Sequence, residues 1–308
     1  MTSKYLRGPA YALGEKERLY KEVEGFQAAA KARQVPYLPE MMGFGGFRVT
    51  QDIYERATVA ARASIAAAGI EPTAIDQVIF CSSSFKERTF RERNIKVGKL
   101  LRECGVTPAR INGISGGGCT DLLASIDIAC RLLDLGAIHN ALIIDIETFL
   151  AETDSDRLLG HALISDGAVA LLVSDSPGRS SGPPQFEILA HGITSDVSEI
   201  GSGMSITNSS PNRTFVKNLL QGAGKSLGEI TRLFGNNVYL PIKCGREGIV
   251  GFTRAQMYLE NVTRTGHCLG CDTVVNLVDF GPGQGGNNYV LYSEAEGHAA
   301  CVALLQLQ

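Results

Sequence analysis

Apolar side chains recur along this chain with two spacings, one typical of helices and one typical of buried strands. Between residues 53 and 68, small and apolar residues recur every three to four positions, which predicts a helix. Pro72 and Asp76 mark a turn into QVIFCSSS (77–84), a β-branched and aromatic run typical of a buried strand. The charged stretch 85–104 follows, and its apolar residues at helical spacing predict an amphipathic helix with a solvated face.

The same alternation continues through the first half of the chain. INGIS (111–115) predicts a strand, residues 120–135 predict a helix with one apolar side, and 141–149 and 166–175 predict two further strands. Strands that alternate with helices, several of them continuous apolar runs, indicate a parallel or mixed sheet covered on both faces. The predicted fold class is therefore α/β.

A Pro-, Gly- and Ser-rich connection at 176–187 separates this part from a second one with a similar pattern. We expect an N-terminal half, 1–180, and a C-terminal half, 181–308. The elements predicted in the second half are a helix at 214–234, a strand at 237–243, a helix at 246–262 and strands at 273–280 and 288–294. The first forty residues are polar and end in the glycine-rich stretch 38–48, so we expect the regular fold to begin after it.

Composition narrows the class of protein. Of the 308 residues, 44% are hydrophobic and 20% charged, as in a soluble globular protein. A net charge of -3 gives no overall attraction to nucleic acid or membrane surfaces, so we expect neither as a partner. No apolar run approaches the roughly 18 residues that cross a bilayer, and residues 1–16 lack the apolar core of a secretion signal, so we expect a cytoplasmic protein. The eight cysteines lie in apolar contexts and are expected to stay reduced.

Three glycines and Cys119 (residues 116–119) stand between the predicted strand at 111–115 and the predicted helix at 120–135. The N–H groups and the positive end of a helix dipole favour a thiolate at such a position, and glycines let a substrate approach the backbone. The same N–H groups can face a developing oxyanion. The pattern predicts a nucleophilic Cys119 with Gly118 at the substrate, although a tight turn ending in an inert, buried cysteine also fits it.

In four motifs, in the expected order, the chain resembles the β-ketoacyl-acyl-carrier-protein synthase III group of the thiolase superfamily. These are AAAGIEPTAIDQVIFCSSS (66–84), the cysteine segment 115–149, LISDGAVALLVSD (163–175) and DTVVNLVDFGPGQGG (272–286). The resemblance implies a thiolase-like layered αβαβα fold that is internally duplicated. It also implies that Cys119 accepts an acyl group from coenzyme A or from the phosphopantetheine arm of an acyl carrier protein.

The resemblance further implies a dimer and substrate contacts. Members of the group join two subunits edge to edge through the strand before the nucleophile, here 111–115, so we expect a homodimer. The loop Phe85–Phe90 lies in a region that the group sends toward the partner's pocket, so we expect Phe90 to contact substrate. The loop with Gly281 and Gly283 corresponds to one that borders the group's active site, and we expect its backbone near the thiol.

Two departures from the group change the expected chemistry. The group has a catalytic histidine directly after a proline at the end of a strand, and after the corresponding Pro241 this chain has Ile242. The group then has a Gly-Asn pair, whose nearest counterpart here is Gly266-His267, in an interval shorter by about one helix. Isoleucine donates no hydrogen bond to the enolate formed when malonyl loses carbon dioxide, so the sequence argues against ordinary malonyl condensation.

Among the five histidines, His267 is the best placed to replace the lost base, because it lies shortly before the glycine loop; a loop histidine without a role is the alternative. Lys243 is a weaker candidate that we expect to be solvated. His267, Cys268 and Cys271 form H-C-x-x-C, but even with Cys244 as a fourth ligand this is a weak indication of zinc. We therefore expect no metal, and no cofactor beyond the coenzyme A or phosphopantetheine of the acyl donor.

Three functions remain open. The first is an acyltransferase of polyketide- or fatty-acid-like metabolism, in which Cys119 receives an acyl group from acyl-CoA or acyl carrier protein and passes it to an acceptor. The second is a condensing enzyme with rearranged catalytic helpers. The third is a catalytically silent subunit that pairs with an active homologue. The retained Cys119 favours the first two, and the lost histidine favours the first and the third.

Overall fold

One large sheet dominates the structure, a computed structural model that describes residues 3–83, 89–107, 109–178, 185–201, 210–281, 283 and 285–307. Its strands in chain order are β1 (Tyr5–Leu13), β4 (Gln77–Cys81), β5 (Arg110–Ile114), β6 (Asn140–Glu147), β7 (Gly167–Ser174), β8 (Phe186–Ser195), β9 (Arg232–Phe234), β10 (Asn288–Ala295) and β11 (His298–Gln306). Across the sheet their order is β5-β4-β6-β7-β1-β8-β11-β10-β9. A separate two-stranded sheet holds β2 (Lys16–Leu19) and β3 (Gly46–Val49).

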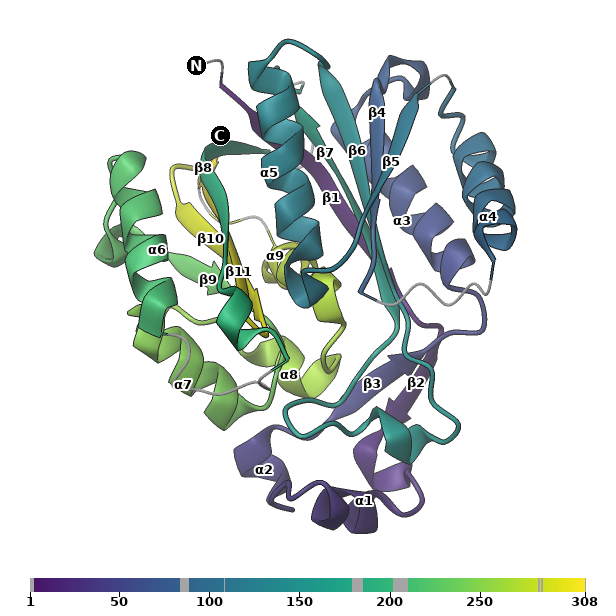
Figure 1. Cartoon of the computed structure of the whole chain (residues 1–308), viewed down its shortest axis with the longest axis vertical. Coiled ribbons are helices and arrows are strands. Elements are labelled where there is room, and N and C mark those ends of the chain that lie inside the picture. Colours follow the sequence, from purple (N-terminus) through teal and green to yellow (C-terminus); the bar gives the residue numbers. More distant parts are fainter. Residues whose placement is uncertain are drawn as a thin grey trace.

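Helices cover both outer faces of the sheet and fill the space between its halves. The helices of the described residues are α1 (Phe26–Ala32), α2 (Pro39–Met42), α3 (Ile53–Ala68), α4 (Phe90–Glu103), α5 (Asp121–Asp134), α6 (Ser210–Gly222), α7 (Leu240–Val250), α8 (Glu260–Arg264) and α9 (Asp272–Phe280), of which α1 and α2 pack beside the small sheet (Figure 1). Helices α3 and α4 pack on one outer face and α6 and α7 on the other, while α5 and α9 lie between the two halves of the sheet (Figure 1). This confirms the layered αβαβα arrangement. None of the helices in the described part is long and apolar enough to cross a membrane.

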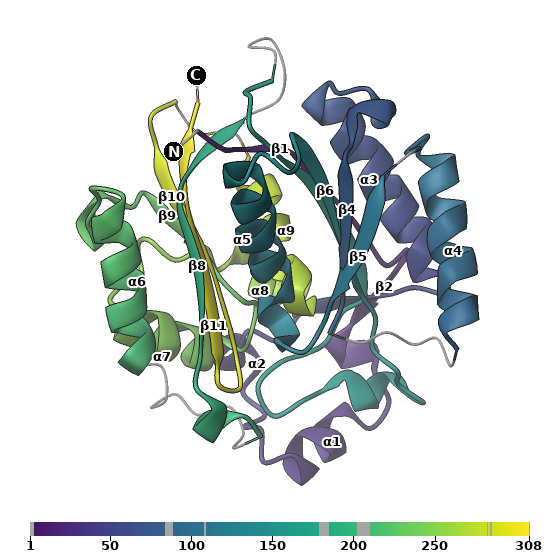
Figure 2. The ribbon, with the colours of Figure 1, turned by 45° about the horizontal axis from the view of Figure 1, so that its top comes forward.

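The sheet divides where β1 meets β8. β1 pairs with β7 along most of its length, but its registered pairs with β8 are Tyr5 with Glu187 and Leu6 with Phe186. Beyond these pairs the two halves diverge and enclose α5 and α9, as Figure 2 shows. The apolar side chains of these two helices belong to the largest hydrophobic core, and burying each such side chain stabilises the fold by roughly 1.5–3 kcal/mol.

The two halves repeat one arrangement of elements. In the first half, β4 leads through α4 to β5 and then to α5. In the second half, β9 leads through α7 to Met257, which forms an isolated bridge with Leu233 of β9. The chain then continues to α8 and α9. Within the described residues, the second half thus contributes four strands to the large sheet and the first half five. The internal duplication is confirmed.

Most of the elements predicted in the first half are confirmed. The helix predicted at 53–68 is α3, which follows Asp52 and ends at Gly69 in a left-handed conformation. The carboxylate of Asp52 caps this helix by accepting the N–H of Tyr54 at 2.9 Å. The strands predicted at 77–84, 111–115, 141–149, 166–175 and 288–294 correspond to β4, β5, β6, β7 and β10.

Two strands predicted in the second half are wrong, because both segments enter helices. Pro241 lies in the first turn of α7, where its missing N–H has no helical partner to lose, so 237–243 leads into a helix. Residues 273–280 belong to α9, which is enclosed by the sheet and is therefore apolar on most sides. Periodicity cannot distinguish such a short apolar run from a strand. The helix predicted at 246–262 is correspondingly the end of α7, a loop and α8.

The ends of the chain also differ from expectation. β1 is an inner strand of the large sheet, and α2 and β3 lie within the glycine-rich stretch 38–48, so the regular fold begins earlier than predicted. Arg7 contributes to the polar appearance of β1, but it is buried and donates to the carbonyl of Ala68 at 2.5 Å. The helix predicted at 214–234 is shorter, because α6 ends at Gly222 and β9 follows.

Candidate active site

Cys119 lies in a single 3₁₀ turn, residues 118–120, directly before α5. Gly116 and Gly118 have φ angles of 116° and 57°, in the left-handed region that favours glycine. A Cβ added at Gly118 would lie 3.2 Å from the Cβ of Ala295. The glycines therefore permit both the turn and its close approach to the end of β10.

Two polar side chains hold this turn. The carboxylate of Asp121 accepts the N–H of Gly117 at 2.9 Å. Ser293, on β10, donates its hydroxyl to the carbonyl of Cys119 at 2.7 Å, and the same hydroxyl lies 3.1 Å from Oδ1 of Asn236. The end of β10 thus supports the turn that carries Cys119, a contact that no sequence motif indicated.

His267 lies opposite Cys119, just before the turn that leads into α9. Its Nε2 is 3.6 Å from Sγ of Cys119, and its side chain is buried. The N–H of His267 donates to the carbonyl of Leu163 at 2.8 Å, and the residue forms an isolated bridge with Ile164, so its backbone is fixed. The structure therefore brings together the two residues that the sequence proposed as catalytic.

Asp272, in the first turn of α9, holds the other side of the imidazole. One of its carboxylate oxygens is 2.5 Å from Nδ1 of His267, and the other accepts the N–H of Cys268 at 2.7 Å. Burial lowers the pKa of His267, but the charges of Asp272 and Cys119 outweigh burial and raise this pKa to about 10. At neutral pH His267 is thus an imidazolium beside Sγ, and a cation at this position stabilises a thiolate.

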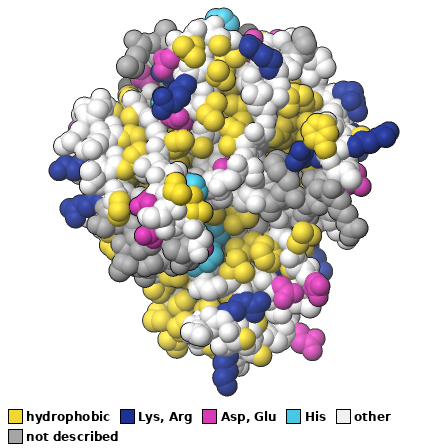
Figure 3. Space-filling model, viewed as in Figure 1, with side chains coloured by type: hydrophobic (Ala, Val, Ile, Leu, Met, Phe, Trp, Pro, Cys, Tyr) yellow, Lys and Arg dark blue, Asp and Glu magenta, His cyan; other side chains and the backbone are white. Residues whose placement is uncertain are grey.

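A second histidine, His161, lies beside the first. The ring centroids of His161 and His267 are 6.1 Å apart. Burial, with repulsion from His267 and Arg246, lowers the pKa of His161 to about 4, so its ring is neutral at physiological pH. Figure 3 shows histidine side chains near the middle of one face of the molecule, next to hydrophobic ones. Sequence reasoning assigned no role to Asp272, which begins the motif 272–286, or to His161, which stands in no recognisable motif.

Asparagines, and not a proline followed by isoleucine, stand at the end of the strand that precedes α7. β9 ends at Phe234, and Asn236 and Asn237 follow it. The N–H of Asn237 donates to Asp272 at 2.6 Å. Ile242 lies instead in the first turn of α7. Equating Ile242 with the group's histidine is therefore wrong, and the argument from Ile242 against malonyl decarboxylation no longer holds.

Gly281 and Gly283 lie away from the thiol. Their loop follows the helix α9 and not a strand. A Cβ at Gly283 would lie 2.3 Å from the hydroxyl of Tyr289, which is near the start of β10. The carbonyl of Cys119 instead accepts a hydrogen bond from Ser293, four residues further along the same strand. At about 3.3 Å per residue, four residues of a strand span roughly 13 Å. The structure does not bring these two glycines to Cys119.

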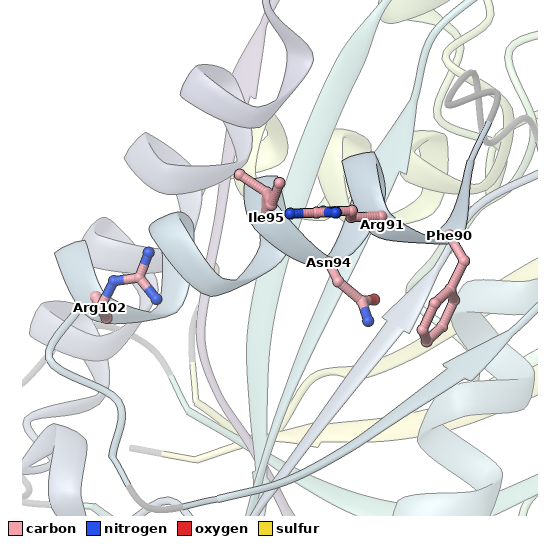
Figure 4. Close-up of a pocket in the computed structure, with 5 residues that line it drawn as sticks. All are labelled: Phe90, Arg91, Asn94, Ile95 and Arg102. Atoms are coloured by element: carbon pink, nitrogen blue, oxygen red, sulfur yellow. The ribbon is translucent and has the colours of Figure 1, made fainter.

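Phe90 is the first residue of α4, and its side chain is 70% exposed. It belongs to an open surface pocket of about 410 Å³ lined by Phe90, Arg91, Asn94, Ile95 and Arg102. Figure 4 shows Phe90 and Asn94 extending from the same side of α4. Neither Cys119 nor His267 lines this pocket, so Phe90 of one chain does not share a pocket with either of them. Phe85, the other aromatic residue of this segment, lies outside the described residues.

Lys243 is buried, although we expected it to be solvated. Its ammonium donates to Glu247 at 2.7 Å and to the carbonyl of Asn236 at 2.9 Å. Burial raises the pKa of Glu247 to about 7 in spite of this partner. Lys243 is therefore committed to an internal ion pair on α7.

The H-C-x-x-C motif contributes to the core. Cys268 and Cys271 are buried among the apolar side chains around α5 and α9, and Cys244 accepts a hydrogen bond from Arg254 at 3.0 Å. Across the part of the chain that the structure describes, no group of three or more His, Cys, Asp or Glu side chains is arranged to hold a metal ion.

Two buried carboxyl groups of β6, Asp145 and Glu147, lie against the turn between His267 and α9. A Cβ added at Gly270 would lie 2.5 Å from a carboxylate oxygen of Asp145 and 3.3 Å from one of Glu147. Ser83 donates its N–H to Glu147 at 3.0 Å and its hydroxyl at 2.8 Å. Burial raises the pKa of Glu147 to about 7 and that of Asp145 well above its usual value.

Proteins of one group resemble this chain in sequence, although no protein-family model matches it. The β-ketoacyl-[acyl-carrier-protein] synthase III of Erythrobacter litoralis is 27% identical over 150 residues, which are 48% of this chain and 45% of that protein. The corresponding protein of Sphingopyxis alaskensis is 27% identical over 182 residues, 57% of this chain and 55% of the relative. The chain thus matches about half the length of these relatives.

Solved structures resemble nearly the whole chain. ChlB3, described as an acyltransferase, superposes with a TM-score of 0.80 at 17% identity, covering 99% of this chain and 98% of that one. A variant of OleA from Xanthomonas campestris gives a TM-score of 0.78 at 18% identity, covering 98% of each chain. The 3-oxoacyl-[acyl-carrier-protein] synthase III of Aquifex aeolicus gives 0.75 at 15% identity, covering 98% and 99%. Nearly the whole chain thus shares the fold of these solved structures, and about half of it is similar in sequence to β-ketoacyl-[acyl-carrier-protein] synthases III.

Proposed function

We propose that the protein is an acyltransferase that takes an acyl group from a coenzyme A or acyl-carrier-protein thioester onto Cys119 and passes it to an acceptor in polyketide- or fatty-acid-like metabolism. The observation that carries the proposal is the contact of Cys119 with His267, whose imidazole is held in turn by Asp272. A cysteine activated by a base that a third group orients is an arrangement for covalent acyl transfer. The similarity to synthase III relatives, which are named for the acyl carrier protein, supports this class of donor.

In the first half-reaction, the thiolate of Cys119 attacks the carbonyl carbon of the donor thioester. A new carbon–sulfur bond forms at Sγ, the carbon–sulfur bond of the donor breaks, and the leaving thiolate takes the Nε2 proton of His267. The N–H groups at the start of α5 have no partner within the helix and are candidate donors for the oxyanion of the tetrahedral intermediate. The products are acyl-Cys119, the free thiol of the donor and a neutral His267.

In the second half-reaction, the acceptor attacks the acyl carbon. Neutral His267 takes the proton of the acceptor hydroxyl or amine at Nε2, and Cys119 leaves as a thiolate beside the re-formed imidazolium. Asp272 orients the ring and stabilises its charged form. A positioned base of this kind contributes roughly 10²–10⁴ to the rate.

The bond between His267 and Asp272 favours transfer over condensation. An oxygen or nitrogen acceptor needs a base, and an imidazole whose Nδ1–H is bound to a carboxylate is a strong one. Decarboxylation of a malonyl group instead needs hydrogen-bond donors at the thioester carbonyl and no base.

A condensing reaction with rearranged helpers is the second candidate, and Asn236 favours it. This residue is buried, and its Oδ1 accepts the N–H of Glu294 at 3.0 Å. Its Nδ2 has no hydrogen-bond partner among the described residues. Because Ser293 links Asn236 to the turn of Cys119, this amide is a candidate donor to a malonyl thioester carbonyl.

We further propose that two copies of the chain join through β5, with Phe90 of each directed toward the other. β5 is the edge strand of the large sheet, and Arg110 to Gly113 are exposed. Ile111 is 52% exposed, and Ile95 on the neighbouring α4 is also exposed. An edge strand presents unpaired N–H and C=O groups that a second copy would pair.

The two reactions are distinguished by donors with and without a removable carboxylate. Butyryl-CoA and malonyl-CoA are each given to the protein, and the release of coenzyme A thiol and of carbon dioxide is measured. The proposal predicts thiol release that depends on Cys119, with carbon dioxide release at least 10² times slower. Carbon dioxide release as fast as thiol release, and lost in Asn236→Ala, would establish the condensing reaction instead. A silent subunit would release neither product.

A further inference from the structure

We propose that a row of three buried asparagines, Asn237, Asn276 and Asn261, positions Asp272 and so sets the reactivity of Cys119. The inference rests on the proposed function for the role of the thiol, but the row itself is defined by hydrogen bonds outside the Cys119–His267 pair. It begins at Asp272 behind the imidazole and ends at a charged cluster on α8 and α9.

Asn237 forms the inner end of the row. Its backbone N–H donates to one carboxylate oxygen of Asp272 at 2.6 Å, and its Nδ2 lies 3.3 Å from the other. With the N–H of Cys268 and Nδ1 of His267, four donors surround this carboxylate. A carboxylate that accepts from four donors is held in one orientation.

Asn276 forms the middle of the row, one helical turn after Asp272 on α9. Its Nδ2 donates to Oδ1 of Asn237 at 2.9 Å and to the carbonyl of Gly235 at 2.8 Å. Its Oδ1 accepts Nδ2 of Asn261, also at 2.9 Å. Asn276 and Asn261 are fully buried, so these contacts are shielded from water.

The outer end of the row is charged. Nδ2 of Asn261 also donates to Asp279 at 2.8 Å, and Oδ1 of Asn261 accepts Nε of Arg264 at 2.9 Å. Arg264 forms an ion pair with Asp279, which also accepts the hydroxyl of Tyr11 on β1 at 2.5 Å. The side chain of Arg264 is half exposed, so the row runs from the catalytic imidazole to the surface.

The chemistry of the partners fixes the direction of every amide. Asp272 only accepts, so the amide of Asn237 turns Nδ2 toward it and leaves Oδ1 for Asn276. The carbonyl of Gly235 only accepts, which fixes Asn276 in the same sense.

The last amide is fixed from both sides. Arg264 only donates and Asp279 only accepts, so Asn261 must present Oδ1 to the first and Nδ2 to the second. Each amide in the row thus directs its N–H toward Asp272 and its oxygen toward Arg264. The three dipoles are aligned between a cation and an anion, an arrangement that stabilises the negative charge of Asp272.

A purely structural role does not require this alignment. Buried polar side chains are costly unless every donor and acceptor is paired, and apolar residues of similar shape often serve as well. Asp272 contacts Nδ1 of His267, and Nε2 of the same ring contacts Sγ of Cys119, so a row that fixes the position of the carboxylate acts on the thiol. Asn237, Asn276 and Asn261 are therefore positioning residues that act through Asp272.

The test measures the rate at which iodoacetamide alkylates Cys119 as a function of pH. Asn276→Leu keeps the approximate shape of the side chain and breaks the row in its middle. We expect alkylation of Cys119 at pH 7 to fall roughly tenfold, and the acid limb of the profile to move to higher pH by about one unit. Asn140→Leu is the matched control, because Asn140 is bonded to Ala74 and Ser174 away from the site. This control should keep the wild-type profile.

Arg264→Gln keeps the test decisive if Asn276→Leu fails to fold. It removes the charge at the half-exposed outer end and should shift the profile in the same direction by a smaller amount. A wild-type alkylation profile in the folded variants, or an equal shift in Asn140→Leu, would overturn the inference. Failure of the proposed function would look different: Cys119 would take no acyl group from any donor, while the alkylation profiles still separated as predicted.

Discussion

Cys119 and His267 are 148 residues apart in the sequence, and their Sγ and Nε2 atoms are 3.6 Å apart in the structure. Cys119 stands within a 3₁₀ turn that leads into α5. His267 stands just before a 3₁₀ turn that leads into α9. Both helices begin with an aspartate, Asp121 and Asp272. The duplicated fold thus brings two equivalent helix N-termini together, one beside Cys119 and the other beside His267.

Because His267 contacts Sγ directly, His267→Ala should slow both half-reactions and not only transfer to the acceptor. We expect each rate to fall by roughly 10²–10⁴, measured as release of the donor thiol and as loss of acyl-Cys119 to the acceptor. His191 provides a matched control, since its Nδ1 lies 2.7 Å from Asp127 in a second histidine–aspartate pair. His191→Ala should react normally, and normal acylation in His267→Ala would remove His267 from the mechanism.

Asp272→Asn should preserve the shape of the site and change its pH dependence. The charges of Asp272 and Cys119 outweigh burial and raise the pKa of His267 to about 10, so removing the carboxylate lowers that pKa. The imidazolium that protonates the leaving thiolate is then lost at lower pH. The alkaline limb of the pH–rate profile for thiol release should therefore move to lower pH, with a lower rate at neutral pH. An unmoved alkaline limb would show that Asp272 does not set the charge of His267.

Glu147 should make the fold less stable as pH rises through the weakly acidic range. Burial raises its pKa in the folded state to about 7, above the ordinary 4.5, so the folded state binds the proton more tightly than the unfolded state. The contribution of Glu147 to the free energy of unfolding is most favourable below about pH 4.5 and is lost between pH 4.5 and 7. Glu147→Gln should remove roughly 2–3 kcal/mol of this decline, measured by urea unfolding at pH 5 and pH 8.

The exposed Glu55 gives the matched control for that measurement. Glu55→Gln on α3 should leave the difference in unfolding free energy between the two pH values unchanged. The decline that remains in Glu147→Gln is expected from Asp145, whose pKa burial also raises. An undiminished decline in Glu147→Gln would mean that Glu147 stays ionised in the folded state.

Ile111 tests the proposed dimer. Ile111→Asp places a charge in the middle of the exposed edge strand β5, where a second copy would bury it, so we expect light scattering to show a shift from dimer to monomer. Val197→Asp is the control, because Val197 is 81% exposed and lies beyond β8. If the dimer forms, Phe90→Ala should change which acyl chains are accepted. A monomeric wild-type protein at micromolar concentration would contradict the proposed interface.

The first half of the chain could be predicted closely because its elements have distinct patterns. The helix of α3 has regular apolar spacing with Asp52 and Gly69 at its ends, and β6 and β7 are continuous apolar runs between polar residues. Cys119 could be identified from local sequence, since a glycine run before an amphipathic helix is a local feature.

The second half was harder because burial on several sides removes periodicity. α9 lies between two parts of the sheet, so 273–280 reads as a strand although it is a helix. This error displaced the glycine loop and hid the role of Asp272, which is visible only once α9 is known to begin there. His267 was selected for its place in the sequence, but its contact with Asp272, and that of Asp272 with Asn237, depend on the packing of separate segments and have no local pattern.

The mass of the intact protein after incubation with an acyl-CoA tests the central claim most directly. The account predicts that the wild-type protein gains the mass of one acyl group, that the group maps to Cys119, and that Cys119→Ala folds normally and gains nothing. Cys244, the other partly exposed cysteine, supplies the control, since Cys244→Ala should be acylated like the wild type. An unmodified wild-type protein, or equal acylation of Cys119→Ala, would contradict the account.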